Sequence, residues 1–372
     1  MPRLFYGNFD FEHRLADPRR EPTKLLKRLN AELATSWLAI ADDDDMIWTP
    51  AAIDAEFFRQ ALAAGLPRVV PIESWDQTPR GVELVPWGWS REALALVERL
   101  EASGKVPSHD AVRQANSRAT SHRLEQGWKV GLQGARRISN LHELEDILGT
   151  SSEQPWVIKS EYGMSGRERI RGRGAPTEAD LQWLRRRLGP GNSVFYEPWV
   201  ERVAEVGIQI EIPPTGSPRL AGLATMFTDE RGQYAGSLVP SPSQQSVPEN
   251  VVWQEAIEVT LRAANELQSL GYFGPVGIDA MQYRDRDGGL KIRPLQDINA
   301  RWTMGRLSLG FGKLLAPDEV GLWVHGSQTT LASEIAARSG LIGQRSIATS
   351  PENVGGTPCF HHSRLVIGQR LI

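Results

Sequence analysis

The N-terminal third of the chain alternates short apolar runs with amphipathic stretches. Apolar runs of about five residues predict buried strands, and apolar spacings of three and four predict helices. The predicted strands are 3–7, 36–41, 68–72 and 82–87. The predicted helices are 22–34, 52–65 and 90–102, of which the second ends at Gly65 and the third begins at the N-cap Ser90. This alternation predicts a small α/β domain with a largely parallel sheet over residues 1–108.

The pattern changes after SGKVPS (103–108), which is typical of a linker. Beyond it, the predicted helices are 110–126, 141–148, 177–188 and 251–270, and the tail from 305 is predicted to be helical at first. The predicted strands are 129–133, 156–159, 194–200, 204–212, 219–229, 275–284 and 290–299, with a loop over 240–250. The last two strands predict a hairpin around 285–289, and after about 345 no pattern is clear. We therefore expect three parts: 1–108, 109–200 and 201–372.

Composition narrows the function classes. A chain of 372 residues is too long for one compact core, and 40% hydrophobic with 23% charged residues is typical of a globular protein. A net charge of -3 argues against a protein that is basic throughout and binds nucleic acid by charge. Because the chain has no long apolar run, no secretory signal and only one cysteine (Cys359), we expect no membrane association, no internal disulfide and a cytoplasmic location.

The predicted hairpin carries the strongest group of polar side chains, in GIDAMQYRDRDGGLKIRPLQDINAR (277–301). Asp297 and Asn299 are two residues apart, so both project from one face of their strand, and Asp279 on the neighbouring strand can approach them. Two carboxylates and an amide oxygen are hard ligands that suit Mg²⁺. Arg301 continues the same face and could neutralise a transferring phosphoryl group. The alternative is a solvated hairpin edge.

A second group follows the apolar strand that ends at Lys159, one of seven lysines beside 35 arginines. The next loop contains Gly163, Ser165 and Gly166, whose backbone N–H groups could close on a phosphate near the lysine charge. A Walker A sequence is absent, so an ordinary hairpin loop is at least as good an interpretation. The arginines at 167, 169, 171 and 173 share one strand face, which suits either phosphate binding or a solvated edge.

A third group lies in VFYEPWVERVAEVGIQIEI (194–212). Pro198 forces an extended turn after Glu197, and the segment from Glu197 through Trp199 to Val200 could offer an adenine its backbone donor and acceptor. Glu205 would be left to accept hydrogen bonds from ribose hydroxyls. By itself this segment is also simply a strand, a turn and a strand.

Together and in this order, the three groups resemble the ATP-grasp superfamily of carboxylate–amine ligases, over roughly residues 110–312. The most specific part is GIDAMQY…IRPLQDINARWTMG, which is similar to the family pattern of an acid on one strand followed by acid-x-Asn-x-Arg on the next. The resemblance implies an α/β chain with the ATP-grasp fold and a Rossmann-like pre-ATP-grasp domain at the N-terminus. It also implies an enzyme, a ligase that forms C–N bonds.

Carried over position by position, the resemblance implies these roles. Lys159 contacts the α/β-phosphates, and the loop Gly163, Ser165 and Gly166 closes over the β/γ-phosphates. Glu197, Trp199 and Val200 meet the adenine, and Glu205 binds ribose. Asp279, Asp297 and Asn299 hold Mg²⁺, with Mn²⁺ as the alternative ion, and Arg301 lies beside an acyl phosphate.

Two positions depart from the family pattern. The family usually has glutamate where Asp297 stands, and aspartate is one methylene shorter. An earlier nucleotide-binding lysine of the family is replaced here by Arg118 in NSRATSH (116–122), with Lys129 as the competing basic residue. Arginine keeps the charge but not the geometry of lysine.

The mechanism implied is attack of a substrate carboxylate on the γ-phosphate of ATP, followed by attack of an amine on the acyl phosphate. The expected carboxylate belongs to an amino acid or peptide. The expected partners are small molecules, with no nucleic acid or membrane, and a homodimer is left open. Three alternatives remain: a kinase of the same fold, a non-catalytic nucleotide-binding module, and a nucleic-acid binder suggested only by the arginines around 167–187.

Three further clusters can be interpreted either as structural or as functional. The acidic run 42–45 is more in keeping with a solvated loop than with a site for a substrate amine. Trp87 and Trp89 suit a groove wall and a sheet anchor equally. His361 and His362, beside Cys359, are too few for a metal site, so we interpret them as structural or surface residues.

Overall fold

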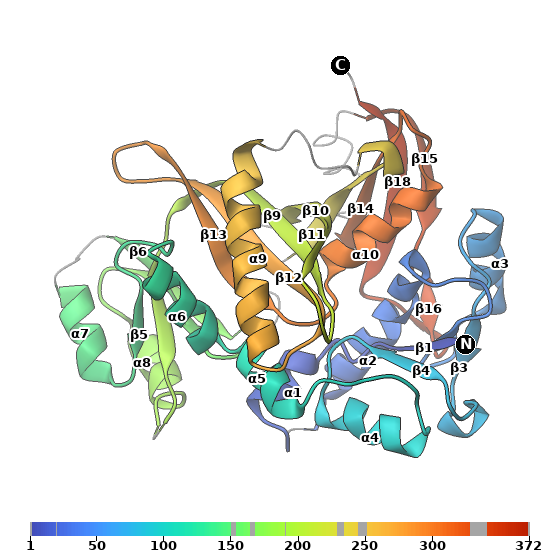
Figure 1. Cartoon of the computed structure of the whole chain (residues 1–372), viewed down its shortest axis with the longest axis horizontal. Coiled ribbons are helices and arrows are strands. Elements are labelled where there is room, and N and C mark those ends of the chain that lie inside the picture. The colour runs from blue at the N-terminus through green and yellow to red at the C-terminus, as the bar shows by residue number, and fades with distance from the viewer. Residues whose placement is uncertain are drawn as a thin grey trace.

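The computed structural model describes residues 2–19, 21–149, 154–163, 168–189, 191–228, 234–244, 251–327 and 341–370. Its strands form three main sheets, which lie in residues 3–86, 136–198 and 201–370 (Figure 1). In Figure 1 the sheet of residues 136–198 (the small-sheet subdomain) lies at the left, the N-terminal domain lies at the lower right, and the large sheet runs from the middle to the upper right. We propose domain boundaries at 108/109 and 200/201, because each of the three sheets takes its strands from one of these segments.

The N-terminal domain has a four-stranded sheet of order β3-β2-β1-β4 in which every pair is parallel, as predicted. One predicted strand is wrong: within 36–41 the residues up to Ala39 belong to a buried 3-10 helix, Ala34–Ala39, that continues from helix α2. Its run of apolar residues is buried on all sides, and a short apolar run does not distinguish a strand from a buried helix. The elements are β1 (Arg3–Tyr6), α1 (Phe11–Ala16), α2 (Lys24–Leu33), β2 (Met46–Trp48), α3 (Ala55–Ala63), β3 (Val70–Ile72), β4 (Glu83–Pro86) and α4 (Arg91–Arg99).

The small-sheet subdomain, residues 136–198, has an antiparallel sheet of order β5-β8-β6-β7. Two predictions before it are wrong. The helix predicted over 110–126 is two helices, because Ser117 is extended and caps the second. The strand predicted over 129–133 is absent, because Lys129 adopts a left-handed conformation and ends that helix. The elements are α5 (His109–Asn116), α6 (Arg118–Trp128), β5 (Arg136–Ile138), α7 (Leu141–Gly149), β6 (Pro155–Ser160), β7 (Arg169–Arg173), α8 (Glu178–Arg185) and β8 (Val194–Pro198).

The large sheet has eight strands in the order β13-β12-β9-β10-β11-β14-β18-β15. The predicted hairpin is confirmed as β12 and β13, whereas the strands after residue 230 other than this hairpin were not predicted. Much of the loop predicted over 240–250 lies outside the described residues. The strands are β9 (Glu201–Ile212), β10 (Arg219–Thr228), β11 (Tyr234–Pro240), β12 (Gly274–Arg284), β13 (Leu290–Asn299), β14 (Val320–Gly326), β15 (Leu341–Ala348) and β18 (His362–Arg370). The helices are α9 (Gln254–Ser269) and α10 (Met304–Gly310), and β16 (Asn353–Val354) pairs with β17 (Thr357–Pro358).

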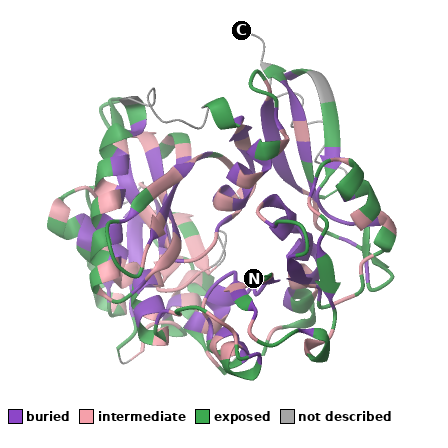
Figure 2. Ribbon diagram, turned by 45° about the vertical axis from the view of Figure 1, so that its right-hand side comes forward, coloured by how far each residue is buried: buried purple, intermediate pink, exposed green. Residues whose placement is uncertain are grey.

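Burial divides the molecule into two main bodies. One apolar cluster joins the N-terminal domain to the large sheet and α9, through side chains such as Trp37, Ile208 and Ala263. Buried residues run along the strands, and exposed residues lie on the outer turns of the helices and on the loops (Figure 2). The small-sheet subdomain has a separate core around Trp156 and Leu184. A subdomain with its own core can change its position without opening the main core. Within the described ranges, no helix combines the length and apolar character that crossing a bilayer requires.

Candidate active site

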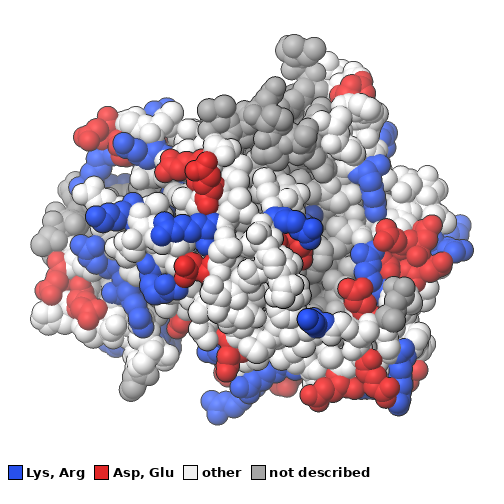
Figure 3. Space-filling model, viewed as in Figure 1, with Lys and Arg blue, Asp and Glu red and all other residues white. Residues whose placement is uncertain are grey.

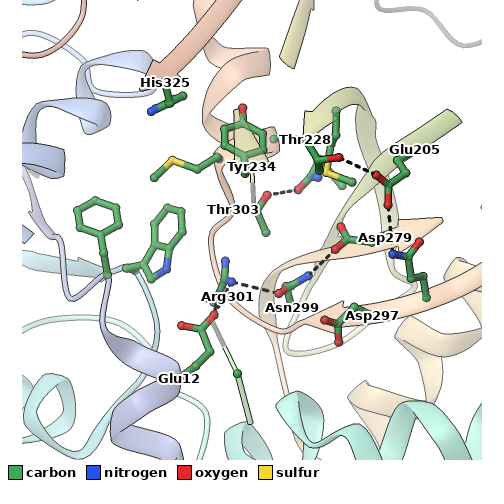
Figure 4. Close-up of a pocket in the computed structure, with 18 of the residues that line it drawn as sticks. Glu12, Glu205, Thr228, Tyr234, Asp279, Asp297, Asn299, Arg301, Thr303 and His325 are labelled. Atoms are coloured by element: carbon green, nitrogen blue, oxygen red, sulfur yellow. Dashed lines mark hydrogen bonds and ion pairs between the residues drawn. The ribbon is translucent and has the colours of Figure 1, made fainter. Parts of the chain in front are cut away.

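A cavity of about 300 Å³ lies where the three parts of the molecule meet. Glu205, Asp279 and Asp297 lie on one side of it, His325 lies on the opposite side, and Arg301 with Glu12 lies between them (Figure 4). Eight of the residues predicted from the sequence to bind nucleotide, metal or substrate line it: Arg118, Lys159, Gly163, Glu205, Asp279, Asp297, Asn299 and Arg301.

Asp279 and Asp297 are directly opposite each other on β12 and β13. The amide of Asn299 donates a hydrogen bond to Asp279 over 3.3 Å. Burial, and then the negative charges of Asp297 and Glu205, raise the pKa of Asp279 to about 8. Two carboxyl groups that approach each other in a partly buried place favour either a proton or a bound cation between them.

This donor set fits a magnesium ion. Asp279 and Asp297 supply hard oxygens on one face of the hairpin, and the raised pKa of Asp279, caused first by burial, means that its charged form would gain from a bound cation. Among the described residues, no group of three or more His, Cys, Asp or Glu side chains is arranged to hold a metal by itself. The expected ion therefore needs oxygen ligands from outside this set, as Mg²⁺ does when substrate phosphates complete its coordination.

Arg118 lies at the cavity, and Lys129 does not. Ser117 accepts a hydrogen bond from the backbone of Ala119 and starts α6, so Arg118 is the first residue of that helix. Its guanidinium is 2.9 Å from Asp297 and is largely buried. Lys129 is exposed at the other end of the same helix. The structure therefore favours Arg118 over Lys129 as the first basic residue of the site.

Lys159 belongs to a buried network of four charged side chains. Its ammonium lies 2.8 Å from Glu197, and Arg293 contacts the same carboxylate over 3.0 Å. Arg293 also forms a two-pronged ion pair with Glu125, at 2.6 and 2.9 Å. Burial alone would raise the pKa of Glu197, but Arg293 and Lys159 outweigh it and hold that pKa far below its usual range. Glu197 is therefore ionised, and its carboxylate positions Lys159.

This network modifies the role predicted for Glu197. Its carboxylate is already shared by Lys159 and Arg293, so an adenine at this hinge would meet backbone groups rather than that side chain. Trp199 has guanidinium groups within about 5 Å of its ring, from Arg171 (5.1 Å) and Arg202 (4.6 Å). Val200 packs in a small apolar cluster with Met281 and Tyr283 of β12. Neither Trp199 nor Val200 lines the main cavity, and their adenine contacts remain predictions.

Glu205 lies on β9 at the edge of the cavity. It accepts hydrogen bonds from Arg202 at 3.0 Å, Gln296 at 3.2 Å and Thr228 at 3.3 Å. Its predicted contact with ribose is untested. Of the predicted glycine loop, Gly163 lines the cavity, whereas Ser165 and Gly166 lie outside the described residues.

Arg301 links the hairpin to the N-terminal domain. It donates a hydrogen bond to the amide oxygen of Asn299 over 3.1 Å and pairs with the buried carboxylate of Glu12 from α1. Its guanidinium lies 5.1 Å from the centre of the Trp87 ring. Trp87 thus lines the cavity and also packs in the main core. Of the two interpretations made from the sequence, a groove wall and an anchor for the sheet, both therefore describe this residue.

Several site residues were not predicted. Glu12 and Glu125 lie on helices whose pattern gives no reason to single out one acid. Arg293 could have been found from the sequence, because it is a charged residue within the apolar run IRPL (292–295). In that strand, only the acids and Asn299 were singled out from the sequence. His361 was interpreted as structural or surface, but it lines the cavity with His325. The acidic run 42–45 lies outside the cavity lining, and its buried Asp45 forms an ion pair with Arg3.

Comparison with known proteins identifies the fold. No family model matches the sequence, and no curated protein matches it significantly. N5-carboxyaminoimidazole ribonucleotide synthetase in complex with ADP is a structural neighbour, with 13% identity, a TM-score of 0.52 and coverage of 98% of this chain and 92% of that one. The synthase from Aspergillus clavatus, solved with ADP and 5-aminoimidazole ribonucleotide, has 11% identity, a TM-score of 0.52 and coverage of 100% and 94%.

A third neighbour is a domain of a carboxylase. The biotin carboxylase domain of the Hydrogenobacter thermophilus 2-oxoglutarate carboxylase, solved with MgADP and bicarbonate, has 12% identity, a TM-score of 0.52 and coverage of 99% of this chain and 86% of that one. These neighbours are ATP-grasp proteins. The chain therefore has the ATP-grasp fold with an N-terminal α/β domain, as the resemblance of its motifs implied.

Proposed function

We propose that the protein is an ATP-dependent ligase that activates a carboxylate as an acyl phosphate and joins it to an amine. One observation carries this proposal. Asp279, Asp297, Asn299 and Arg301 from the large sheet line one cavity together with Lys159 from the small-sheet subdomain. A non-catalytic module has no physical need for this combination of paired acids and converging cations.

The residues of the cavity can bind and orient a nucleotide. Lys159 and Arg118 present positive charge from two different elements toward the same space, where phosphates would lie. The Glu197–Arg293 network holds Lys159 in place, because Glu197 remains ionised. Gly163 lets the backbone of the predicted loop approach a phosphate closely.

Asp279, Asp297 and Asn299 would hold Mg²⁺, which supplies charge neutralisation to the phosphates when bound. Arg301 lies beside them and can neutralise the negative charge that develops when a carboxylate oxygen attacks the γ-phosphate. Glu12 keeps the guanidinium oriented toward the cavity. The separate core of the small-sheet subdomain allows it to close over the site, which would protect an acyl phosphate from water.

The activity is testable by ADP release. A screen of amino acids and dipeptides, singly and in pairs, with MgATP should find a combination in which ADP release requires both a carboxylate and an amine. Replacement Asp297→Asn should lower that release by at least about a hundredfold, since it removes a negative charge that would hold Mg²⁺ against the phosphates. The matched control is Asp287→Asn in the exposed turn of the same hairpin, which should leave the rate unchanged.

Two results would contradict the proposal. ADP release that needs no amine and yields a stable phosphorylated product would instead show a kinase. ADP release that is equal in Asp297→Asn and in the unaltered protein would show that the paired acids have no part in the reaction.

A further inference from the structure

The cavity has a second end that the phosphate chemistry does not use. Two pairs of rings line it: Phe9 and Trp87 from the N-terminal domain, 4.7 Å apart, and Tyr234 and His325 from the large sheet, 5.4 Å apart. In Figure 4, His325 and Tyr234 lie across the cavity from Asp297, with Arg301 between the two sides. We refer to this as the aromatic end, which also includes Leu29, Leu33, Met304 and His361.

Charge is distributed unequally between the two ends. The acidic lining residues are Glu12, Glu205, Asp279 and Asp297, and the basic ones are Arg118, Lys159, Arg169, Arg202 and Arg301. The named residues of the aromatic end include no carboxylate, lysine or arginine, and the nearest charges lie at its edge, where Arg301 is 5.1 Å from the centre of the Trp87 ring and pairs with Glu12. Glu32 lies close by on α2, but it accepts hydrogen bonds from the backbone N–H groups of Phe360 and His361 and pairs with Arg28.

One polar atom at this end has no partner among the described residues. His325 is 7% exposed, and its Nδ1 lies 3.0 Å from Nε2 of His361, whereas its own Nε2 makes no hydrogen bond. Burial, and then the nearby His361, lower the pKa of His325 well below its usual value, so the ring is neutral. A buried nitrogen without a partner is costly, and a ligand that supplies the missing hydrogen bond recovers that cost.

We propose that the aromatic end binds the body of the carboxylate substrate, and that this body is uncharged and apolar, of aromatic or branched-alkyl type, with its polar tip at His325. This rests on the proposed ligase function, because it assumes that the carboxylate lies at Arg301. An apolar body gains free energy against the rings and Met304, whereas a charged tip beside His325 would meet the rings of Tyr234 and His361 and no oppositely charged carboxylate, lysine or arginine among the described lining residues there.

The test is a binding measurement that needs no turnover. Calorimetric titration, with a non-hydrolysable ATP analogue and Mg²⁺ present, compares 3-phenylpropionate with 6-aminohexanoate and glutarate, which carry a cationic and an anionic tip. We expect 3-phenylpropionate to bind at least about tenfold more tightly than either. Equal affinities, or preference for a charged tip, would overturn the proposal.

A charge placed at the aromatic end should reverse this selectivity. Leu29→Glu should weaken 3-phenylpropionate binding at least about tenfold and make 6-aminohexanoate the preferred probe. The matched control is Leu25→Glu on the same helix, because Leu25 is 62% exposed and lies outside the cavity lining. Circular dichroism and retained binding of the ATP analogue show that both variants fold. Unchanged preference in folded Leu29→Glu would contradict the proposal.

The contact with His325 has its own readout. 3-(4-hydroxyphenyl)propionate, which adds a hydroxyl, should bind about threefold to tenfold more tightly than 3-phenylpropionate, and His325→Phe should remove that difference while leaving 3-phenylpropionate binding intact. An advantage that persists in His325→Phe would place the tip elsewhere. The two proposals can fail separately. If 3-phenylpropionate binds selectively but no acid supports ADP release, the substrate inference stands and the ligase proposal is refuted. If only acids with a charged tip support ADP release, the ligase proposal stands and the substrate inference is refuted.

Discussion

At the scale of single residues, the site depends on charges that hold one another in place. Arg293 is 2% exposed and neutralises both Glu125 and Glu197, and Glu197 in turn positions Lys159. Such a network stabilises a protein only while every member has its partner, because an unpaired buried charge is expensive. The position of Lys159 therefore depends on Arg293, because both contact the carboxylate of Glu197.

Replacement Arg293→Met should therefore lower the free energy of unfolding by about 3–5 kcal/mol, because it leaves two carboxylates without their buried partner. Urea unfolding measures this loss. Arg284→Met, at the exposed end of the same hairpin, is the control and should change stability by less than about 0.5 kcal/mol. Equal stability of the two variants would mean that the network is not held together as described.

Lys159 itself allows a comparison between two lysines. Lys159→Met should reduce substrate-dependent ADP release by about 10²–10³-fold, since it removes one preorganised charge from the phosphate end. Lys129→Met should leave the rate within a factor of two, because Lys129 is exposed at the end of α6. A comparable loss in both variants would contradict the placement of the nucleotide.

Asp279 predicts a dependence on pH. Its carboxyl has a raised pKa of about 8, mainly through burial, whereas in the unfolded chain it ionises near its ordinary value of 3.8. Between these values the folded state holds the proton more tightly, so the metal-free protein loses stability as the pH rises from about 4 to 8. Asp279→Asn removes this loss and should stabilise the metal-free protein by about 1–3 kcal/mol at pH 8, with no gain at pH 4.

Thermal unfolding in the presence of a chelator, at several pH values, measures this difference. Added MgATP should then stabilise the unaltered protein more than Asp279→Asn, because the ionised carboxylate would be a metal ligand. Asp287→Asn should show neither effect. A difference between the unaltered protein and Asp279→Asn that does not vary with pH would refute the assigned pKa.

At the scale of elements, the hairpin is the element that the sequence predicted best. The alternation of side chains in 275–284 and 290–299 predicted which of them share a face, and the observed register pairs Asp279 with Asp297. The segment 36–41 was misassigned because a fully buried run reads alike in a strand and in a helix. The break at Ser117 and the left-handed Lys129 are local events that periodicity does not detect.

A glycine in the small sheet gives a test at this scale. A Cβ at Gly172 on β7 would lie 2.7 Å from Cη2 of Trp156, a rigid ring in the subdomain core. Gly172→Ala should therefore destabilise the small-sheet subdomain by about 1–3 kcal/mol. Gly127→Ala on α6 meets open space and should stabilise the protein by about 0.5–1 kcal/mol. Urea unfolding compares them, and a stabilising Gly172→Ala would contradict the packing of β7 on Trp156.

At the scale of the whole molecule, the motifs predicted the fold although overall identity to the structural neighbours is low. Acids, a lysine and a hinge at set intervals identified an ATP-grasp arrangement, and structural neighbours share that fold. The aromatic end could not be predicted, because Phe9, Trp87 and His325 come from segments far apart in the sequence. The Lys159–Glu197–Arg293 network likewise needs three strands to be brought together first.

The small-sheet subdomain and the main body have separate cores, so a nucleotide that contacts both should reduce their relative motion. ATP would contact Lys159 from the small-sheet subdomain and the acids of the large sheet at once. Hydrogen exchange should therefore slow in β6 (Pro155–Ser160) and β8 (Val194–Pro198) when MgATP is added. Slowing confined to the N-terminal domain would contradict a nucleotide that bridges the two bodies.

Surface charge bears on the remaining alternative of nucleic-acid binding. On the face shown in Figure 3, acidic side chains interrupt the basic ones, so this face has no continuous basic surface. Together with a net charge of -3, this favours a small-molecule enzyme over a protein that binds by phosphate contacts alone. An affinity for RNA or DNA that falls steeply with added salt would contradict this interpretation.

The central claim is the transfer of a phosphoryl group to a carboxylate before an amine attacks. It is tested by supplying the carboxylate substrate identified by ADP release with ¹⁸O in both carboxyl oxygens and analysing the released phosphate by mass spectrometry. We expect one ¹⁸O atom in each phosphate, because the carboxylate oxygen leaves with the phosphoryl group. Phosphate without ¹⁸O, formed together with ADP and amide, would contradict the acyl phosphate and with it the proposed mechanism.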